Sequence, residues 1–329
     1  MSRPRLGFLG TGWIGRHRME AMIASGGIKT VAVGDPSPDC ASAAAALAPG
    51  AEIVPSLEAM LEHGLDGVVI ATPSALHAAQ AIAALQAGVA VFCQKPLGRD
   101  AGEVAAVIAA ARSANRLLGC DFSYRHTAGV QAIAPLLSAN QLGRVHAADL
   151  VFHNAYGPDK PWFYDRAQSG GGCVIDLGVH LVDLALWLLG WPEVREVRSR
   201  LFAGGEPLRA PVEQVEDFAL AELELAGGAV VRLACSWRLH AGQEAVIEAS
   251  FYGTHGGARL RNVGGSFYDF EALRLDGTGA RVLASPPDAW GGRAAVAWAE
   301  QLATVRGFNP AAERFATVAA VLDRIYAAA

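Results

Sequence analysis

Three polar side chains interrupt an otherwise apolar segment in the middle of the chain. The segment reads GGGCVIDLGVHLVDLALWLLG, and its polar members are Asp176, His180 and Asp183. If the segment is helical, spacings of four and three residues place all three side chains on one face. Buried carboxylates and histidines are costly unless they are paired or face a cavity, so this stripe is a candidate for proton-transfer chemistry. The alternative interpretation is a core helix whose histidine is simply satisfied. A metal site is disfavoured, because no nearby residue completes a recognised ligand set.

A lone lysine ends a second apolar run. The stretch VFCQKPLGRD carries Lys95 between Gln94 and Pro96. The proline disfavours helix at Lys95 and keeps it extended, so its side chain should point outward from the tip of a strand. Ligands of open parallel sheets bind beyond the carboxyl ends of the strands, so we expect Thr72, Pro73, Gln94 and Lys95 to line one crevice. The alternative is a solvated lysine at a strand end.

A glycine-rich turn near the start of the chain indicates a dinucleotide site. In GFLGTGWIGRHRMEAM, the residues Gly10, Gly12 and Gly15 directly follow an apolar run. Their expected roles are a tight turn, close backbone approach to a pyrophosphate, and close packing of helix on strand. Asp35 follows Gly15 by 20 residues. That spacing suits a carboxylate that accepts the adenosine ribose hydroxyls and repels a 2′-phosphate, so NAD is favoured over NADP.

The first part of the chain alternates short apolar runs with alanine-rich segments. The expected strands are Arg5–Gly10, Thr30–Gly34, Gly67–Ala71, Ala90–Cys93 and Leu117–Asp121, and the expected helices include Ala41–Ala48, Ala75–Ala87 and Gly102–Ser113. This alternation predicts an α/β fold with a doubly wound parallel sheet, covered on both faces. We assign residues 1–122 to an NAD(P)-binding Rossmann domain.

The remainder of the chain has a different character. The expected elements are helices over Gly129–Ala139 and Gly172–Leu189, and strands over Val145–His153, Val194–Phe202, Asp217–Leu225, Val230–Leu239 and Ala245–Tyr252, with turns at Gly227–Gly228 and Gly256–Gly257 and closing helices over Ala294–Val305 and Ala311–Ala328. This order predicts a large, mostly antiparallel open sheet. We assign residues 123–329 to substrate binding and oligomerisation, with the terminal helices free to pack back on the first domain.

Composition excludes several classes of protein. Of the 329 residues, 52% are hydrophobic and 18% are charged, with a formal charge of −5 and no basic block. Nucleic-acid binding is therefore disfavoured, since phosphate contacts need clustered Lys and Arg. The five cysteines form no CxxC pair, which indicates buried thiols in a reducing compartment. The longest apolar segment contains two aspartates and a histidine, which would be costly in lipid, so we expect a cytoplasmic protein with no membrane span.

The motifs together resemble the glucose–fructose oxidoreductase, inositol dehydrogenase and rhizopine catabolism family of NAD(P)-dependent sugar dehydrogenases (Gfo/Idh/MocA). The resemblance covers nearly the whole chain and rests on GTGWIG at 10–15, ATPSALH at 71–77, QKP at 94–96, SYR at 123–125 and GGGCVIDLGVHLVD at 170–183. The usual tripeptide of the family is EKP, so Gln94 removes a negative charge beside Lys95.

The resemblance implies roles for individual residues. The catalytic residues would be Lys95, Asp176 and His180. The cofactor would contact Gly10, Gly12, Trp13, Ile14, Gly15, Asp35, Thr72, Pro73, His77, Gln94 and Lys95. The substrate would contact Arg125, His153, Trp162, Asp176, His180 and Trp237. Two of these have plain alternatives, an ion pair for Arg125 and a strand-end histidine for His153.

The implied reaction is oxidation of a secondary alcohol of a sugar, polyol or inositol, or the reverse ketone reduction. NAD, with NADP as second candidate, would accept hydride, because amino-acid side chains cannot. His180 would take the hydroxyl proton, Lys95 would polarise the same oxygen, and Asp176 would orient His180 or bind a neighbouring hydroxyl.

Three other functions fit the same motifs. One is an NAD-dependent glycosidase that oxidises the sugar transiently and eliminates the aglycone. Another is a non-catalytic dinucleotide-binding sensor protein. The third is a reductase of imines, diols or tetrapyrroles. The resemblance also implies a homodimer or homotetramer, with the exposed sheet face as the natural interface.

Overall fold

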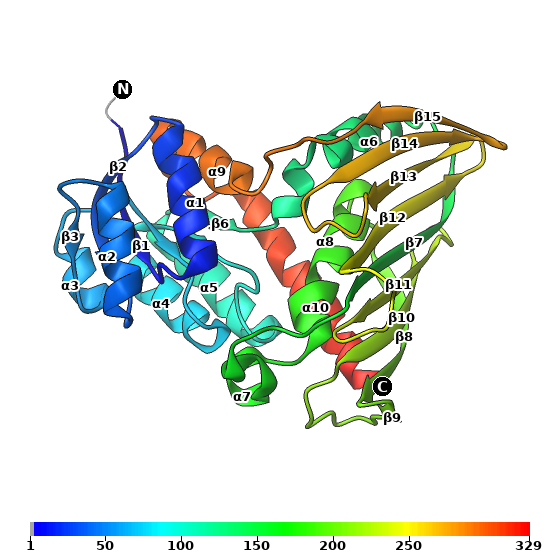
Figure 1. Cartoon of the computed structure of the whole chain (residues 1–329), viewed down its shortest axis with the longest axis horizontal. Helices are drawn as coiled ribbons and strands as arrows, with labels where there is room; N and C mark the ends of the chain where they lie inside the picture. The colour runs from blue at the N-terminus through cyan, green and yellow to red at the C-terminus, as the bar shows by residue number, and fades with distance from the viewer. Residues whose placement is uncertain (1–2) are drawn as a thin grey trace. The chain divides into compact units, whose positions relative to one another are not determined.

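The computed structural model describes residues 3–329, which divide into two compact units (Figure 1). The first unit comprises the chain up to Ser123 together with Gly291–Thr317. The second unit comprises Tyr124–Trp290 together with Val318–Ala329. The division falls within the last helix, α10 (Glu313–Ala327).

The first unit is built on a six-stranded sheet in the order β3-β2-β1-β4-β5-β6, with all neighbours parallel. Its strands are β1 (Arg5–Leu9), β2 (Lys29–Gly34), β3 (Glu52–Ile53), β4 (Gly67–Ile70), β5 (Ala90–Cys93) and β6 (Leu118–Cys120). Its helices are α1 (Trp13–Ala24), α2 (Pro38–Leu47), α3 (Leu57–Leu61), α4 (Ser74–Gln86), α5 (Ala101–Ala114) and α9 (Arg293–Thr304). This strand order is that of the doubly wound dinucleotide-binding fold, which confirms the predicted class.

Helix α9 completes the core of the first unit although it comes from the end of the chain. Its Trp298 is 4% exposed and packs with Leu6, Phe8 and Phe92. Two strand glycines make room for this ring, because a Cβ at Gly67 or at Gly119 would lie 2.6 Å from an atom of the indole. The glycines therefore fix where α9 docks on the sheet.

The second unit contains a nine-stranded sheet in the order β15-β14-β13-β12-β7-β11-β10-β8-β9. Its strands are β7 (Val145–Asn154), β8 (Val194–Ala203), β9 (Glu206–Pro207), β10 (Phe218–Leu225), β11 (Val230–Ser236), β12 (Ala245–Gly253), β13 (Gly256–Asn262), β14 (Phe270–Asp276) and β15 (Gly279–Ala284). Only β7 and β11 pair in parallel, so the prediction of a mostly antiparallel sheet is confirmed.

Three details of the predicted second sheet were wrong. The expected strand to Leu239 ends at Ser236, and the glycine pair expected as a turn begins β13 at Gly256. The strands β13, β14 and β15 were not anticipated as a group. In β15 the first four residues are exposed, so no apolar alternation marks it in the sequence.

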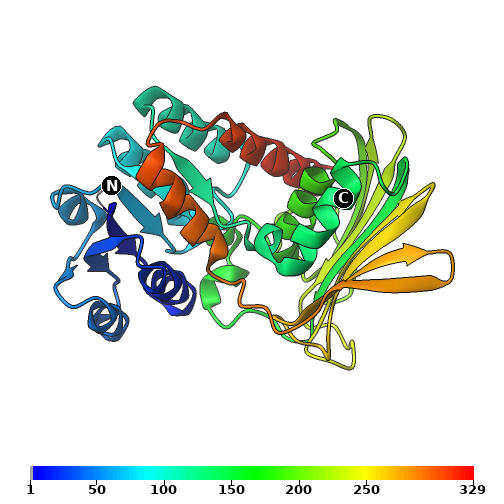
Figure 2. The ribbon, with the colours of Figure 1, turned by 90° about the horizontal axis from the view of Figure 1, so that it is seen from above.

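Helices cover one face of the nine-stranded sheet (Figures 1 and 2). Helices α6 (Ala128–Ser138) and α8 (Val179–Leu188) pack on this face, where strand residues such as Leu150, Leu223 and Leu233 are buried. None of the helices in residues 3–329 covers the opposite face, which we call the open face (Figure 2). The strand alternation thus separates a core side from an uncovered side.

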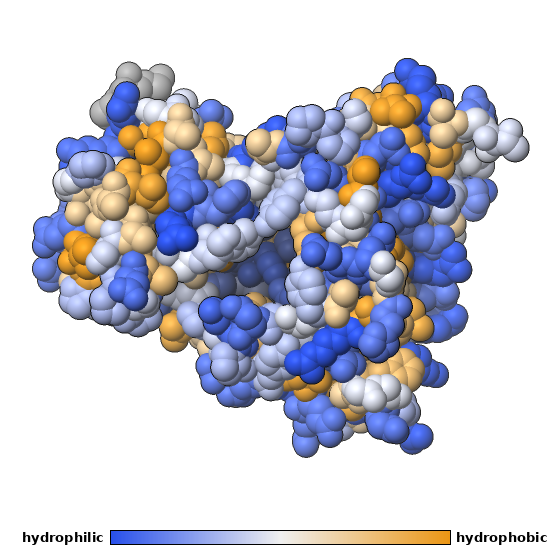
Figure 3. All heavy atoms as spheres, in the orientation of Figure 1, coloured by the Kyte–Doolittle hydropathy of each residue, from blue (hydrophilic) through white to orange (hydrophobic). Residues whose placement is uncertain are grey.

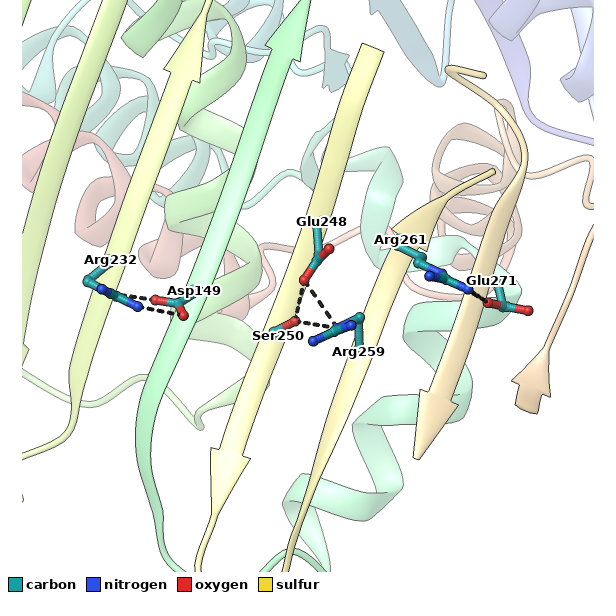
Figure 4. Close-up of polar contacts among 7 residues, drawn as sticks. All are labelled: Asp149, Arg232, Glu248, Ser250, Arg259, Arg261 and Glu271. Atoms are coloured by element: carbon teal, nitrogen blue, oxygen red, sulfur yellow. Dashed lines mark hydrogen bonds and ion pairs between the residues drawn. The ribbon is translucent and has the colours of Figure 1, made fainter. Parts of the chain in front are cut away.

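The open face carries cross-strand ion pairs (Figure 4). Arg232 of β11 forms two hydrogen bonds to Asp149 of β7, with N–O distances of 2.6 and 2.8 Å. Arg261 of β13 pairs with Glu271 of β14 at 2.8 Å. Such exposed pairs contribute about 0–1 kcal/mol each, so their main effect is to neutralise charge on the face.

One helical stretch, Arg166–Leu188, is long and apolar enough to cross a membrane by length and composition, but 89% of its most apolar window is buried inside the protein. That burial is typical of the core helix of a soluble protein. On the side drawn in Figure 3, hydrophobic and hydrophilic side chains are interspersed.

Candidate functional site

The glycine turn of the first unit has the geometry of a phosphate cradle. Gly10 has φ +82°, and a Cβ there would lie 2.5 Å from the backbone of Ala71. A Cβ at Gly15 would lie 2.0 Å from the Gly10 oxygen, whereas a Cβ at Gly12 would meet nothing within 4 Å. No side chain caps α1 at Gly12. The open space at Gly12 and the uncapped N–H groups of the first turn fit a pyrophosphate.

Asp35 lies beside this turn at the end of β2. Its Oδ2 accepts a hydrogen bond from the Thr11 backbone N–H at 2.6 Å, and its Oδ1 accepts one from Ser37 N–H at 2.9 Å. A carboxylate offers about four acceptor sites, so these two bonds fix its orientation and leave capacity for two ribose hydroxyls. The other predicted residues of this turn are Trp13, which is 62% exposed, and Ile14, which is half-buried.

His77 ties together the loops that follow β4 and β5. Its Nε2 lies 2.6 Å from the Thr72 carbonyl oxygen and its Nδ1 lies 2.6 Å from the Pro96 carbonyl oxygen. The ring is 1% exposed. Burial lowers the pKa of His77, although the two carbonyl oxygens act in the opposite direction. Both ring nitrogens are engaged, so the structure gives His77 a role in holding these loops and does not present it to a ligand; Thr72 and Pro73 remain half-buried.

A buried carboxylate lies next to Gln94. The Gln94 amide donates a hydrogen bond to Asp121 Oδ2, and Arg18 Nε donates to the same oxygen at 2.6 Å. Asp121 is 1% exposed and comes directly after β6. The negative charge that QKP lacks relative to EKP is therefore present on the neighbouring strand. Lys95 itself is half-buried and follows β5.

In the second unit, the helix with the polar stripe begins irregularly. Its first turn is a π-helix, Val174–Gly178, and it continues as α8. The predicted start at Gly172 was therefore two residues early. Asp176 lies within the π-turn, and its Oδ2 accepts a hydrogen bond from Trp237 Nε1 at 3.1 Å. Single π-turns occur frequently at functional sites, and here one carries a carboxylate that an indole N–H orients.

His180 lies further along the same helix among aromatic rings. It is 7% exposed, with its ring 4.9 Å from the Tyr124 ring and 6.4 Å from the Phe152 ring, measured between centroids. Tyr124 meets the imidazole at an interplanar angle of 64°. Tyr124 of the SYR motif therefore lies beside the candidate acid–base group. The sequence had not indicated this position for Tyr124.

Asp183 and Arg125 form a separate ion pair. Arg125 Nε donates to Asp183 Oδ2 at 2.8 Å, and Nη2 donates to Oδ1. The guanidinium also lies over the rings of Trp187 and Trp191, 5.6 and 5.3 Å from their centroids. Burial raises the pKa of Asp183, while Arg125 lowers it by a smaller amount. The structure thus shows the ion pair given as the alternative for Arg125, and a substrate contact of Arg125 stays a prediction.

His153 lies on the open face. Its Nδ1 is 2.7 Å from Ser236 Oγ, and its ring stacks on Phe218 with centroids 6.0 Å apart. The preceding residue, Phe152, contacts His180 on the helix-covered face. Because successive residues of a strand point to opposite faces, the structure does not bring His153 together with His180 in one chain. The contact of His153 with the substrate stays a prediction.

An aromatic cluster adjoins Asp176. Trp162 lies in a short 3₁₀ turn, Pro161–Tyr164, and stacks on Phe163 with ring centroids 3.8 Å apart. Phe163 and Tyr164 both meet the ring of Trp237 edge-on, at 6.3 and 5.6 Å. Trp162 is thus linked to Asp176 through Phe163 and Trp237, and the substrate contacts of the two tryptophans stay predictions. Phe163 and Tyr164 were not predicted to lie near the site. The cluster of aromatic residues in PWFY was the feature of the sequence that could have indicated them. Among residues 3–329, no group of three or more His, Cys, Asp or Glu side chains could hold a metal ion.

Comparison with protein-family models gives two matches. Residues 5–122 match the model described as oxidoreductase family, NAD-binding Rossmann fold. Residues 130–259 match the model of the GFO/IDH/MocA C-terminal domain.

Several named proteins are similar in sequence. A protein of Amycolatopsis mediterranei (strain S699) named "Putative UDP-kanosamine synthase oxidoreductase subunit" is 31% identical over 273 residues, 78% of this chain and 75% of that protein. The D-glucoside 3-dehydrogenase of Escherichia coli (strain K12) is 26% identical over 205 residues, 59% of this chain and 58% of that protein. The inositol 2-dehydrogenase of Acidiphilium cryptum (strain JF-5) is 33% identical over 190 residues, 56% of this chain and 54% of that protein. The match thus spans little more than half the length of the last two.

Solved structures share the fold over the whole chain. GenD2 from gentamicin A biosynthesis, in complex with NAD, gives a TM-score of 0.83 at 24% identity and covers 100% of this chain and 95% of that one. Levoglucosan dehydrogenase, in complex with NADH and levoglucosan, gives 0.83 at 22% identity, with 99% and 97% covered. With both family models and the Amycolatopsis relative in agreement, the chain belongs to the Gfo/Idh/MocA family of oxidoreductases with an NAD-binding Rossmann fold.

Proposed function

We propose that the protein is an NAD-dependent dehydrogenase that oxidises a secondary alcohol of a sugar, polyol or inositol-like substrate, or reduces the corresponding ketone. The observation that carries the proposal is the arrangement on the buried helix of the second unit. There, Trp237 holds the Asp176 carboxylate and His180 follows on the same helix. The named relatives, a glucoside dehydrogenase and an inositol dehydrogenase among them, support the substrate class.

In this proposal, each of the two units binds one reactant. The first unit would bind the dinucleotide, with the pyrophosphate at Gly10, Gly12 and Gly15 and the adenosine ribose at Asp35. A carboxylate at that position repels a 2′-phosphate, so NAD would be preferred over NADP. The second unit would bind the alcohol.

In the proposed mechanism, His180 accepts the proton of the reacting hydroxyl. Its neighbour Asp176, held by Trp237, orients the imidazole or accepts a hydrogen bond from an adjacent hydroxyl of the substrate. When bound, NAD supplies the acceptor for the hydride that leaves the carbinol carbon. Lys95 enters the proposal from its QKP motif, as the cation that stabilises negative charge on the reacting oxygen. Ketone reduction would use the same groups in the opposite protonation states.

The test is NADH formation, measured by ultraviolet absorbance, with NAD or NADP and a panel of sugars and polyols. We expect substrate-dependent NADH from NAD, lost in Lys95→Ala and lowered by a factor of about 10² to 10⁴ in His180→Ala, the usual contribution of a general base. An unchanged turnover number in His180→Ala would reject the acid–base assignment. Cleavage of glycosides without net NADH would indicate the glycosidase, and tight NAD binding with no turnover would indicate a sensor.

We further propose that the open face packs on the same face of a second copy. Its ion pairs are satisfied within the sheet (Figure 4), so little charge opposes the approach of an identical face. Leu220 of β10 lies on this face and is 46% exposed. Leu220→Glu should convert the oligomer to a monomer in light scattering after gel filtration. Leu76→Glu, in a leucine 45% exposed on α4 of the first unit, is the matched control that should not.

A cytoplasmic location is proposed from the thiols. All five cysteines are free, including Cys173 and Cys235, whose sulfurs lie 3.8 Å apart. Unbridged neighbouring thiols are typical of a reducing compartment. Fractionation of the source cells tests this, and recovery outside the cytoplasmic fraction would contradict it.

A further inference from the structure

The first turn of the helix that carries Asp176 and His180 lacks a local cap. The residue at the N-cap position, Cys173, makes no capping hydrogen bond through its side chain. The sequence before it is three glycines, which have no side chains to offer. The N–H groups at the start of a helix need partners when they are buried, and Gly172, Cys173 and Val174 are all buried here.

A single residue from a distant segment supplies these partners. Glu216, which precedes β10, is fully buried. Its Oε1 accepts hydrogen bonds from the N–H groups of Gly172 and Val174, both at 2.9 Å, and its backbone oxygen accepts one from Cys173 N–H at 3.0 Å. Three consecutive N–H groups of the helix start therefore end on one glutamate about forty residues away in sequence.

Tyr326 of α10 completes the arrangement. Its hydroxyl donates to Glu216 Oε1 at 2.8 Å, and the guanidinium of Arg166 lies 4.7 Å from the centroid of its ring. The glycines make room for both partners. A Cβ at Gly172 would lie 1.8 Å from the Glu216 carbonyl oxygen, and a Cβ at Gly171 would lie 1.9 Å from the Tyr326 hydroxyl. The close approach of Tyr326 and Glu216 thus explains Gly171 and Gly172.

The charge distribution favours this role over simple packing. The N-terminus of a helix carries partial positive charge, which stabilises an anionic partner. Burial raises the pKa of Glu216, and the hydrogen bonds from Val174, Gly172 and Tyr326 oppose that rise. Burying a carboxyl group costs free energy that an apolar side chain would not cost. The hydrogen bonds that Glu216 accepts from the helix start offset this cost.

We propose that Glu216 is a positioning residue for the proposed active-site helix, acting as an N-cap supplied from another segment, with Tyr326 fixing its carboxylate. Asp176 lies only two residues after Val174, in the π-turn that this cap anchors. Loss of the cap lets the first turn shift, and Asp176 and His180 shift with it. Displacements of about 1 Å can lower catalytic rates by about 10²-fold. The inference rests on the proposed function for its effect on turnover.

The test compares three variants. Glu216→Gln keeps the size, removes the negative charge, and replaces Oε2, which accepts a second bond from Gly172 N–H at 3.0 Å, with an N–H₂ group. Tyr326→Phe keeps the ring over Arg166 and removes only the hydroxyl. The matched control is Ser199→Ala, because Ser199 Oγ donates a buried hydrogen bond to the Ile325 carbonyl oxygen at 2.6 Å, one residue from Tyr326, without touching the helix start.

Two measurements are made on each full-length variant. The first is amide hydrogen exchange of the peptide covering residues 170–182, and the second is the steady-state kcat and KM. Glu216→Gln should accelerate exchange in that peptide at least tenfold and lower kcat about 10- to 100-fold, with the NAD dissociation constant unchanged. Tyr326→Phe should show smaller changes of the same kind. Ser199→Ala should leave kcat and exchange in this peptide unchanged despite any loss of thermal stability.

Unchanged exchange in Glu216→Gln would overturn the proposal, as would equal effects on kcat of Tyr326→Phe and Ser199→Ala. The comparison of the two hydroxyl variants stands even if Glu216→Gln fails to fold. If the wild-type protein turns over no polyol, the proposed function fails, and hydrogen exchange alone decides whether Glu216 caps the helix.

Discussion

The ion pair between Arg125 and Asp183 predicts that a variant at Arg125 harms folding and leaves substrate affinity intact. In Arg125→Met, the aliphatic stem is kept and the charge is removed. Asp183, whose side chain is 2% exposed, then loses both of its bonds to Arg125. Removing one partner of a buried pair typically costs about 3–5 kcal/mol. The contacts with Trp187 and Trp191 add about 0.5–1 kcal/mol each.

The expected loss of about 4–7 kcal/mol is reduced when the carboxyl group of Asp183 takes up a proton. Burial raises the pKa of Asp183, so without Arg125 its neutral form is favoured in the folded state. A carboxyl group with a raised pKa contributes stability at low pH that is lost as pH rises through that pKa. Arg125→Met should therefore be destabilised more at pH 8 than at pH 5. The double variant Arg125→Met/Asp183→Leu should recover most of the loss, since neither charge is left buried.

The assay is urea unfolding followed by tryptophan fluorescence, to which Trp187 and Trp191 beside the pair contribute. The slope with urea should be unchanged if only stability is altered. KM for the sugar or polyol should stay within about twofold. A loss below about 1 kcal/mol together with a tenfold higher KM would refute the reasoning and restore Arg125 as a substrate contact.

The structure supports four further predictions. Trp237→Phe keeps an aromatic ring, although a smaller one, and removes the N–H bound to Asp176, so kcat should fall about 10- to 100-fold, as for a hydrogen bond to a charged group; unchanged steady-state kcat would contradict this. Asp35→Asn should weaken NAD binding about tenfold and improve NADP binding relative to NAD in a fluorescence titration. Burial lowers the pKa of His153, so the folded protein loses stability as pH falls through the ordinary histidine value of about 6.5. Between about pH 7.5 and 5.5, the melting temperature should therefore fall less in His153→Gln than in the wild type. Trp298→Ala should lower the free energy of unfolding of the first unit by about 3–5 kcal/mol, and less than 1 kcal/mol in chemical denaturation would argue against its place in the core.

The parallel sheet of the first unit was predictable because every long strand is a buried apolar run followed by a turn and a helix. Its five predicted strands are all present within a residue or two. The strand missed, Glu52–Ile53, has two residues, both exposed, and carries no period to detect. Helix α9 was predicted as a helix, but its docking in the first unit depends on the space at Gly67 and Gly119, which no local pattern reveals.

The second sheet was harder to predict at its edge. Strands β7, β10, β11 and β12 alternate, over part of their length, buried residues with half-buried or exposed ones, and they were anticipated. Strands β13 and β14 are joined by the loop 263–269, β14 and β15 by a tight turn at Gly277, and β15 is largely exposed. Exposed edge strands are specified by pairing with a neighbour and by the turn, so their apolar signal is weak.

The candidate site, like the second sheet, was predictable only in part. The residues in motifs could be named from the sequence, but their partners could not. The bonds of Arg125 to Asp183, of Trp237 to Asp176 and of Glu216 to Gly172 each join residues more than forty positions apart. Whether a histidine on a strand faces the helices or the open side depends on register, and a shift of one residue reverses it. The sequence alone therefore assigned His153 to neither face.

The central claim is hydride transfer from a carbinol carbon to NAD, and isotope transfer tests it most directly. The protein is incubated with NAD and carbon-deuterated D-glucose or myo-inositol, and the cofactor is then examined by mass spectrometry. The account predicts reduced cofactor that carries one deuterium, formed in equal amount to the ketone product and absent in Lys95→Ala. Cofactor that carries no deuterium, with both substrates left unoxidised while NAD is bound, would contradict it.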